Sequence, residues 1–196
     1  MPSRNTIREY DIPAYYHVYN RGAGRMSIFL DAQDKRKFLS LLERYLSDDD
    51  AHATYSTFDI ELFAYCVMSN HFHLLLFQEH DPTAMTQLMR SVGTAYSMYY
   101  NKKYKSYGHA FQSVFRSSRI TEESYLLHIS RYIHLNPEKY KTYKWSSLPY
   151  YLGAEAPLWI KPDRLLDMSP TKYEAFLEDY KDRRTALKEI KDQLAF

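Results

Sequence analysis

Cysteine is almost absent from this chain of 196 residues. The single Cys66 cannot form an intrachain disulfide, and it stands in an apolar run over residues 63–68 that favours a buried strand. A chain without disulfides suits a reducing compartment, and residues 1–5 carry no apolar signal region. No apolar stretch approaches the length of a membrane span. We therefore expect a cytoplasmic protein with no membrane partner.

Glycine, tryptophan and net charge are scarce as well. The 5 Gly and 8 Pro argue against extended low-complexity linkers, and a net charge of +2 does not by itself indicate nucleic-acid binding. Any contact with DNA must therefore depend on local clusters of basic side chains. Tyrosine is abundant, with 20 Tyr and 10 Phe beside 2 Trp. Because a tyrosine ring suits both base stacking and the rim of a core, this excess alone does not decide between the two.

Strand and helix patterns alternate along the chain in the order β-α-β-β-α-β-α, followed by a tail. Asp31 can cap the first helix, and Pro137 ends the third, because the residue before a proline disfavours helix. The pattern favours the α+β class, with a ferredoxin-like antiparallel sheet, helices on one face and a C-terminal helical extension. We expect a domain over residues 1–153 and the extension over 154–196. The expected strands cover residues 15–19, 58–68, 71–77 and 111–120, and the expected helices cover 31–46, 81–103, 121–136 and a stretch from about 170.

Two histidines alternate with apolar residues in the third expected strand. His71 and His73 project from the same face of that strand, whereas Phe72 and Leu74 project into the helical layer. Imidazole is a common metal ligand, and two adjacent imidazoles form half of a metal site. Taken alone the pair is a weak signal, since chance placement on a hairpin surface explains many such pairs.

The helix that ends before Pro137 carries polar residues where it must pack on the sheet. Tyr132 and Asn136 share one face of this helix, and His128 and Tyr125 lie one and two turns earlier. A polar stripe against a sheet is costly unless it lines a wet or metal-bearing site. The plain alternative is that Tyr132 belongs to the core and His128 to its rim.

Together these segments resemble a known family. Residues 67–76 (VMSNHFHLLL) are similar to the His-hydrophobic-His strand of the single-tyrosine HUH transposases. Residues 131–137 (RYIHLNP) are similar to the tyrosine helix of the REP-associated tyrosine transposases within that superfamily. Further landmarks match at residues 16–22, 108–112, 115–116 and 145–147. The resemblance covers about residues 15–153, and its motifs are specific in combination and in this order.

The resemblance implies a mechanism. A divalent ion, Mg²⁺ or Mn²⁺, is expected on His71, His73 and Asn136, since two imidazoles and an amide suit a hard, exchangeable ion better than structural zinc. Tyr132 is expected to attack a phosphate of single-stranded DNA, which leaves a 5′-phosphotyrosine link and a free 3′-hydroxyl. Tyr125 is the rival nucleophile. Tyr132 is preferred because it stands one turn before Asn136 and matches the family motif.

The resemblance also implies a DNA partner. The family binds hairpins from repetitive extragenic palindromes (REP) beside a short single-stranded guide, so single-stranded DNA with a REP-like hairpin is expected here. Arginines can contact phosphates and tyrosines can stack on bases, although the lysine-rich helix end could equally be a solvated surface. The chain is expected to be a monomer or a homodimer. The expected DNA-binding residues are Arg21, Arg116, Arg119, Tyr99, Tyr100, Lys102 and Lys103.

Two other functions stay open at this point. One is a metal-dependent hydrolase that uses water, although no acidic residue follows His73 before Glu79. The other is a catalytically silent, ferredoxin-like nucleic-acid-binding protein. A covalent DNA–tyrosine adduct would distinguish the transposase from both.

Overall fold

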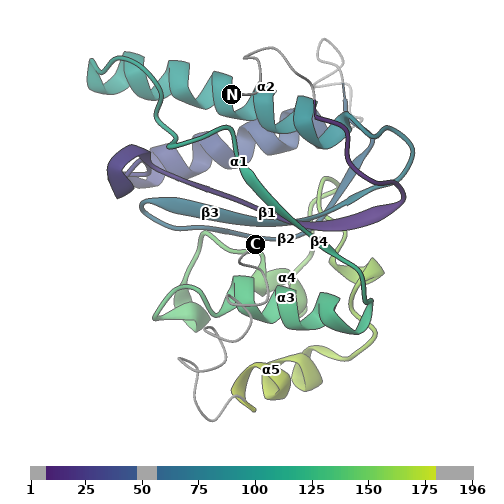
Figure 1. Ribbon diagram of the computed structural model, residues 1–196. Helices are drawn as coiled ribbons and strands as arrows, with labels where there is room; N and C mark the ends of the chain where they lie inside the picture. The colour runs from purple at the N-terminus through teal and green to yellow at the C-terminus, as the bar shows by residue number, and fades with distance from the viewer. Residues whose placement is uncertain (1–7, 48–56, 180–196) are drawn as a thin grey trace.

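A four-stranded antiparallel sheet organises the computed structural model, which describes residues 8–47 and 57–179 (Figure 1). Strand β1 is central and pairs with β3 and β4, while β2 pairs with the other side of β3. This is the α+β, ferredoxin-like sheet that the order of elements predicts. In the sheet order β2-β3-β1-β4, the strands are β2 (Ile60–Val67), β3 (His71–Gln78), β1 (Ala14–Arg21) and β4 (Arg116–Ile120).

Two long helices, α1 (Ala32–Leu46) and α2 (Ala84–Tyr104), cover one face of the sheet (Figure 1). Asp31 caps α1 as expected, with its side chain accepting a hydrogen bond from the Asp34 backbone N–H at 2.9 Å. The core on this side is built from alternate strand residues and the apolar stripes of both helices. The β3 side chains in this layer are Phe72, Leu74 and Leu76.

The opposite face is covered too, by α3 (Ser124–His134), the short α4 (Leu148–Tyr151) and α5 (Pro170–Glu178). The expectation of helices on one face therefore holds for α1 and α2 only. The signal for the second layer lies in β2, which is buried at every position except Glu61. A strand that is buried on both sides needs two packed layers. The α3 residues in this second core are Leu126, Ile129, Tyr132 and Ile133.

Residues beyond Gly153 pack against the sheet in the part of the chain that the structure describes. The Trp159 ring stacks on Tyr65 of β2 at 5.6 Å, and the Lys161 backbone N–H donates to the Leu62 carbonyl at 2.8 Å. Within residues 8–47 and 57–179, 3₁₀ turns complete the elements at η1 (Ala23–Arg25), η3 (Tyr140–Thr142) and η4 (Pro162–Arg164). The division of the chain at residue 153 stays a prediction.

Most element boundaries differ from the expected ones by one to three residues, and the largest difference is at the fourth strand. The fourth strand begins at Arg116 rather than at Phe111, which makes only an isolated bridge to Gly22. The Asn20 amide donates to the carbonyls of Ser113 and Val114 at 2.9 and 2.8 Å. These bonds hold the loop before β4 against β1 without extending the β1–β4 strand pairing. Helix α3 ends at His134, before the expected residue 136.

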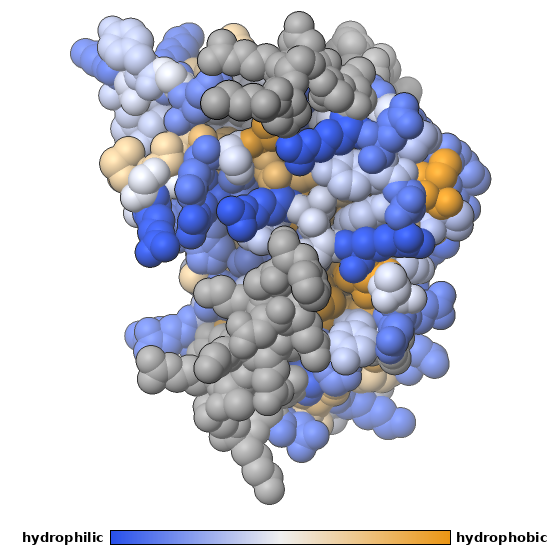
Figure 2. Space-filling model, in the orientation of Figure 1, coloured by the Kyte–Doolittle hydropathy of each residue, from blue (hydrophilic) through white to orange (hydrophobic). Residues whose placement is uncertain are grey.

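Most of the molecular face in Figure 2 is hydrophilic, and strongly hydrophobic residues show there only in small patches. No described helix combines the length and apolar character needed to cross a membrane.

Candidate active site

The sheet face beneath α3 carries a row of polar rings. Tyr19 lies opposite His73 in the β1–β3 register, and Arg21 lies opposite His71. His17 belongs to the same face, because alternate residues of a strand point the same way. The rings of His71 and His73 are 5.0 Å apart between centroids, so the shared face that their spacing predicts is observed.

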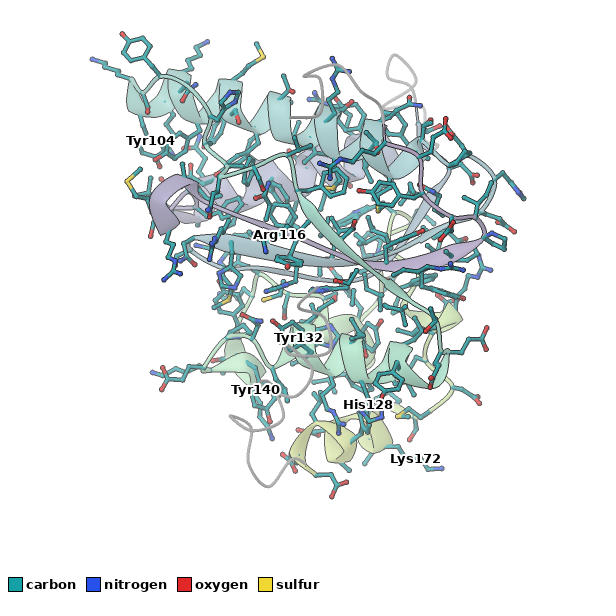
Figure 3. The ribbon with its side chains drawn as sticks, viewed as in Figure 1. Tyr104, Arg116, His128, Tyr132, Tyr140 and Lys172 are labelled. Carbon is teal, nitrogen blue, oxygen red and sulfur yellow. The ribbon has the colours of Figure 1, made fainter. Side chains whose placement is uncertain are left out.

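Helix α3 places Tyr132 over these histidines (Figure 3). Its ring meets His73 edge-on at 5.3 Å and His17 edge-on at 5.7 Å. Burial raises the pKa of the Tyr132 hydroxyl, whereas a hydrogen bond with Asn136 lowers it. Tyr125, the rival nucleophile, is 38% exposed at the start of α3, and its ring contacts His128 at 6.0 Å. Of the two tyrosines, Tyr132 is therefore the one in contact with the strand histidines.

Asn136 links the helix to the strand. Its Oδ1 lies 3.0 Å from Nε2 of His71, although the two residues are 65 positions apart. The same side chain also hydrogen-bonds with Tyr132, and this contact acts to lower the pKa of the phenol. One amide thus contacts both the tyrosine and His71.

The donor atoms at His71 suit a divalent cation. Nδ1 of His71 lies 2.7 Å from Asn70 Oδ1 and Nε2 lies 3.0 Å from Asn136 Oδ1, and because both oxygens are acceptors a neutral His71 can donate to only one of them. In the tautomer that donates to Asn70, Nε2 presents a lone pair beside the Asn136 oxygen, 3.0 Å away. Two neighbouring ligands of an octahedral ion at about 2.0–2.1 Å are separated by roughly this distance. Among the described residues, no three His, Cys, Asp or Glu side chains gather for a metal, and the side-chain oxygen beside His71 belongs to the amide of Asn136.

The arginines expected to bind DNA are divided between the two sheet faces. Arg116 lies opposite Tyr19 in the β1–β4 register and is exposed, so it belongs to the face of the histidines. Arg21 shares that face, and its Nε donates to Gln112 Oε1. Arg119 points to the other face, where it forms an ion pair with Asp11 at 2.7 Å.

The expected DNA-binding residues Tyr99, Tyr100, Lys102 and Lys103 lie on α2, on the far side of the sheet from Tyr132. Tyr99 and Lys103 contact the buried carboxylate of Asp34 at 2.8 and 2.7 Å. Burial acts to raise the pKa of Asp34, but hydrogen bonds from these two side chains and from Tyr104 hold it below the ordinary value. The structure does not bring the α2 residues to the histidines, and their role in DNA binding stays a prediction.

Sequence reasoning missed the role of two residues of β1, His17 and Tyr19. His17 Nε2 lies 2.9 Å from His73 Nδ1, and the Tyr19 ring stacks on His17 at 5.2 Å. Burial lowers the pKa of His17 to about 3, so its imidazole is neutral. The alternation of residues 15–21 places His17, Tyr19 and Arg21 on one face, but it does not tell which neighbouring strand they meet.

Comparisons with known proteins agree with this arrangement. A family model described as "Transposase IS200 like" matches residues 13–136, whereas a search of curated proteins found no match. A solved REP-associated tyrosine transposase bound to a REP hairpin has the same fold, with a TM-score of 0.56 and 17% identity over 86% of this chain and 96% of that chain. A structure from Deinococcus radiodurans R1, described as a candidate transposase, gives a TM-score of 0.41 and 15% identity over 63% of this chain and 88% of the other. Since the family model spans both the histidine strand and the tyrosine helix, the predicted resemblance is confirmed, and the chain belongs to the IS200-like transposase family.

Proposed function

We propose that this transposase cuts and rejoins single-stranded DNA at hairpin-flanked, REP-like sites, with Tyr132 as the nucleophile. One observation carries the proposal. Tyr132 lies against His73, and Asn136, one turn further on, reaches His71. Two motifs far apart in the sequence thus converge on one small polar site. If Tyr132 were only a core residue, this convergence would not be needed.

His71, His73 and Asn136 would hold a divalent ion, Mg²⁺ or Mn²⁺. When bound, this ion supplies a Lewis acid that polarises the scissile phosphate and stabilises the charge developing on it. The protein residues around it orient the ligands, since Asn70 accepts from His71 and Asn136 bridges to the nucleophile.

Tyr132 would form a bond from its phenol oxygen to phosphorus while the bond from phosphorus to the 3′ oxygen breaks. The phenol loses its proton as it attacks, the departing 3′ oxygen takes up one proton to become the 3′-hydroxyl, and the tyrosine keeps the 5′ phosphate. One phosphoester replaces another, so the reverse reaction rejoins a strand without a nucleotide cofactor. Because burial holds Tyr132 in its neutral form, the hydrogen bond from Asn136 is needed as negative charge develops on the phenol oxygen.

The DNA strand would approach along the exposed rim of the site. Arg116 and Arg21 flank Tyr19 on the histidine face and would contact phosphates there. The REP hairpin in the structurally similar transposase supports a hairpin beside the cleaved strand as the substrate. We place the reaction in the cytoplasm and leave monomer and homodimer as alternatives for the active form.

Incubation with a hairpin-bearing single strand and Mn²⁺ tests the proposal. The wild-type chain should form a covalent adduct that survives denaturing electrophoresis, and Tyr132→Phe should form none while still binding the hairpin. Tyr125→Phe is the matched control and should form the adduct. Adducts that persist in Tyr132→Phe but disappear in Tyr125→Phe would move the nucleophile to the rival position.

Cleavage without any adduct in the wild-type chain would favour the water-using hydrolase. Hairpin binding with neither cleavage nor adduct would favour the silent binding protein.

A further inference from the structure

His17 occupies an unusual position beneath the candidate active site. It is 2% exposed, and its Nε2 lies 2.9 Å from Nδ1 of His73 with the two ring planes within 14° of each other. The ring also stacks on Tyr19 at 5.2 Å and meets the edge of Tyr132 at 5.7 Å. The buried ring of His17 therefore contacts the expected metal ligand His73, the proposed nucleophile Tyr132, and Tyr19.

Stability alone does not explain a histidine at this position. Within the described structure, His17 Nδ1 is buried and has no hydrogen-bond partner. A polar atom buried in this way costs free energy that an aromatic ring such as Phe would avoid. Residues that break a rule of packing without local compensation are concentrated at functional sites.

The contact with His73 supplies the missing reason. Two neutral imidazoles share one proton across the 2.9 Å contact. When Nδ1–H of His73 donates to His17, Nε2 of His73 keeps a lone pair and can bind an ion. The opposite arrangement leaves a proton on Nε2 of His73, and that nitrogen cannot act as a ligand.

We propose that His17 is a positioning residue for the metal site, which accepts a hydrogen bond from His73 Nδ1 and so keeps the proton of His73 on Nδ1 and a lone pair on Nε2 for a divalent ion. The inference rests on the proposed function, since it assumes that His73 is a ligand. It extends that function by assigning a residue of β1 to a site otherwise built from β3 and the end of α3. Hydrogen bonds of this kind orient metal-binding histidines and raise their basicity.

Titration of Mn²⁺ alone into the full chain, followed by calorimetry, tests this role without relying on catalysis. His17→Phe keeps an aromatic ring of similar size, and it removes both the acceptor and the unpartnered nitrogen. We expect Mn²⁺ affinity to fall on the order of 10- to 100-fold, the usual effect of losing such a partner, while the melting temperature stays equal or rises. His17→Gln carries an amide oxygen close to the position of Nε2 and should recover part of the affinity. His80→Gln, at a histidine whose side chain is 78% exposed, is the control and should bind like the wild type.

Opposite results would overturn the inference. Equal Mn²⁺ affinity in His17→Phe and the wild type would reduce His17 to a packing residue, and no recovery in His17→Gln would exclude the acceptor role. If the wild-type chain itself binds no Mn²⁺, the metal site of the proposed function fails together with this inference. If the wild type binds and His17→Phe matches it, only this inference fails.

The tautomer of His73 provides a second measurement that needs no variant. ¹⁵N spectra of the wild-type histidines with saturating Mg²⁺ should show the His73 proton on Nδ1. A proton on Nε2 of His73 in the Mg²⁺-bound chain would refute the proposal.

Discussion

Replacing Asn136 by Asp should separate ion binding from nucleophile activation. The Asn136 side chain has two contacts, an oxygen 3.0 Å from His71 Nε2 and a hydrogen bond with Tyr132, in which we assign the amide nitrogen as the donor because the oxygen faces His71. A carboxylate keeps the oxygen and adds a negative charge, which a divalent cation favours. The same carboxylate has no proton to donate, so Tyr132 loses its hydrogen bond. We therefore expect Asn136→Asp to bind Mn²⁺ at least as tightly as the wild type and to react more slowly.

The size of the rate effect follows from the lost hydrogen bond. Tyr132 is 8% exposed, so little water is available to replace the amide donor. A hydrogen bond to a charged group contributes about 1.5–3 kcal/mol, and the phenol oxygen becomes charged as it attacks. At about 1.4 kcal/mol for each factor of ten, the rate of adduct formation should fall roughly 10- to 150-fold at saturating Mn²⁺. The added negative charge close to Tyr132 acts in the same direction, because it raises the pKa of the phenol.

Two measurements on the same preparation check this reasoning. Calorimetry with Mn²⁺ gives the affinity, and the adduct formed in a single turnover on a hairpin-bearing strand gives the rate. Asn101→Asp adds the same charge on α2, on the other face of the sheet, and should leave both values unchanged. Adduct formation at the wild-type rate in Asn136→Asp would refute the role of the amide donor. Loss of Mn²⁺ binding in that variant would refute Asn136 as a ligand.

Three further predictions concern the metal, the buried carboxylate of Asp34, and the buried hydrogen bond between His134 and Tyr173. Chelation of divalent ions with EDTA should abolish adduct formation and leave hairpin binding measurable by gel shift; cleavage that continues in EDTA would exclude a metal-dependent reaction. Asp34→Asn should lower the free energy of unfolding in denaturant by about 2–3 kcal/mol, because the buried carboxylate that accepts from Lys103 at 2.7 Å is lost. Hydrogen bonds hold the pKa of Asp34 below its ordinary 3.8, so its contribution to the free energy of unfolding is present above that pH and is lost as the pH falls through the pKa of the folded state. On acidification below about pH 4, Asp34→Asn should therefore lose less stability than the wild type. Tyr173→Phe should cost about 1–3 kcal/mol of unfolding free energy, because buried His134 Nδ1 loses its partner at 2.8 Å, whereas Tyr107→Phe, at a ring that is 95% exposed, should cost nothing measurable.

Local patterns in the sequence were sufficient for the elements of this fold. The capping side chain of Asp31 and the apolar periodicity after it predicted α1, and the alternation around His71 predicted β3. The packing of helices on both faces of the sheet was not predicted. The apolar run in β2 shows that the strand is buried, but it does not tell which helices pack against each face. The fourth strand is shorter than expected, since Asn20 binds the carbonyls of Ser113 and Val114 and holds that loop outside the ladder.

The sequence by itself determined that His71 and His73 share a face of a strand, and it predicted Tyr132 and Asn136 on one face of a helix, although α3 ends at His134 and Asn136 lies just beyond it. These relations depend only on the period of one element, two residues in a strand and 3.6 in a helix. Only the tertiary structure decided that the two pairs meet, that His17 joins them from β1, and that Lys103 contacts Asp34 on the far side of the sheet. The physical reason is that contacts between elements depend on strand register and helix packing, which the whole core sets and no local period encodes.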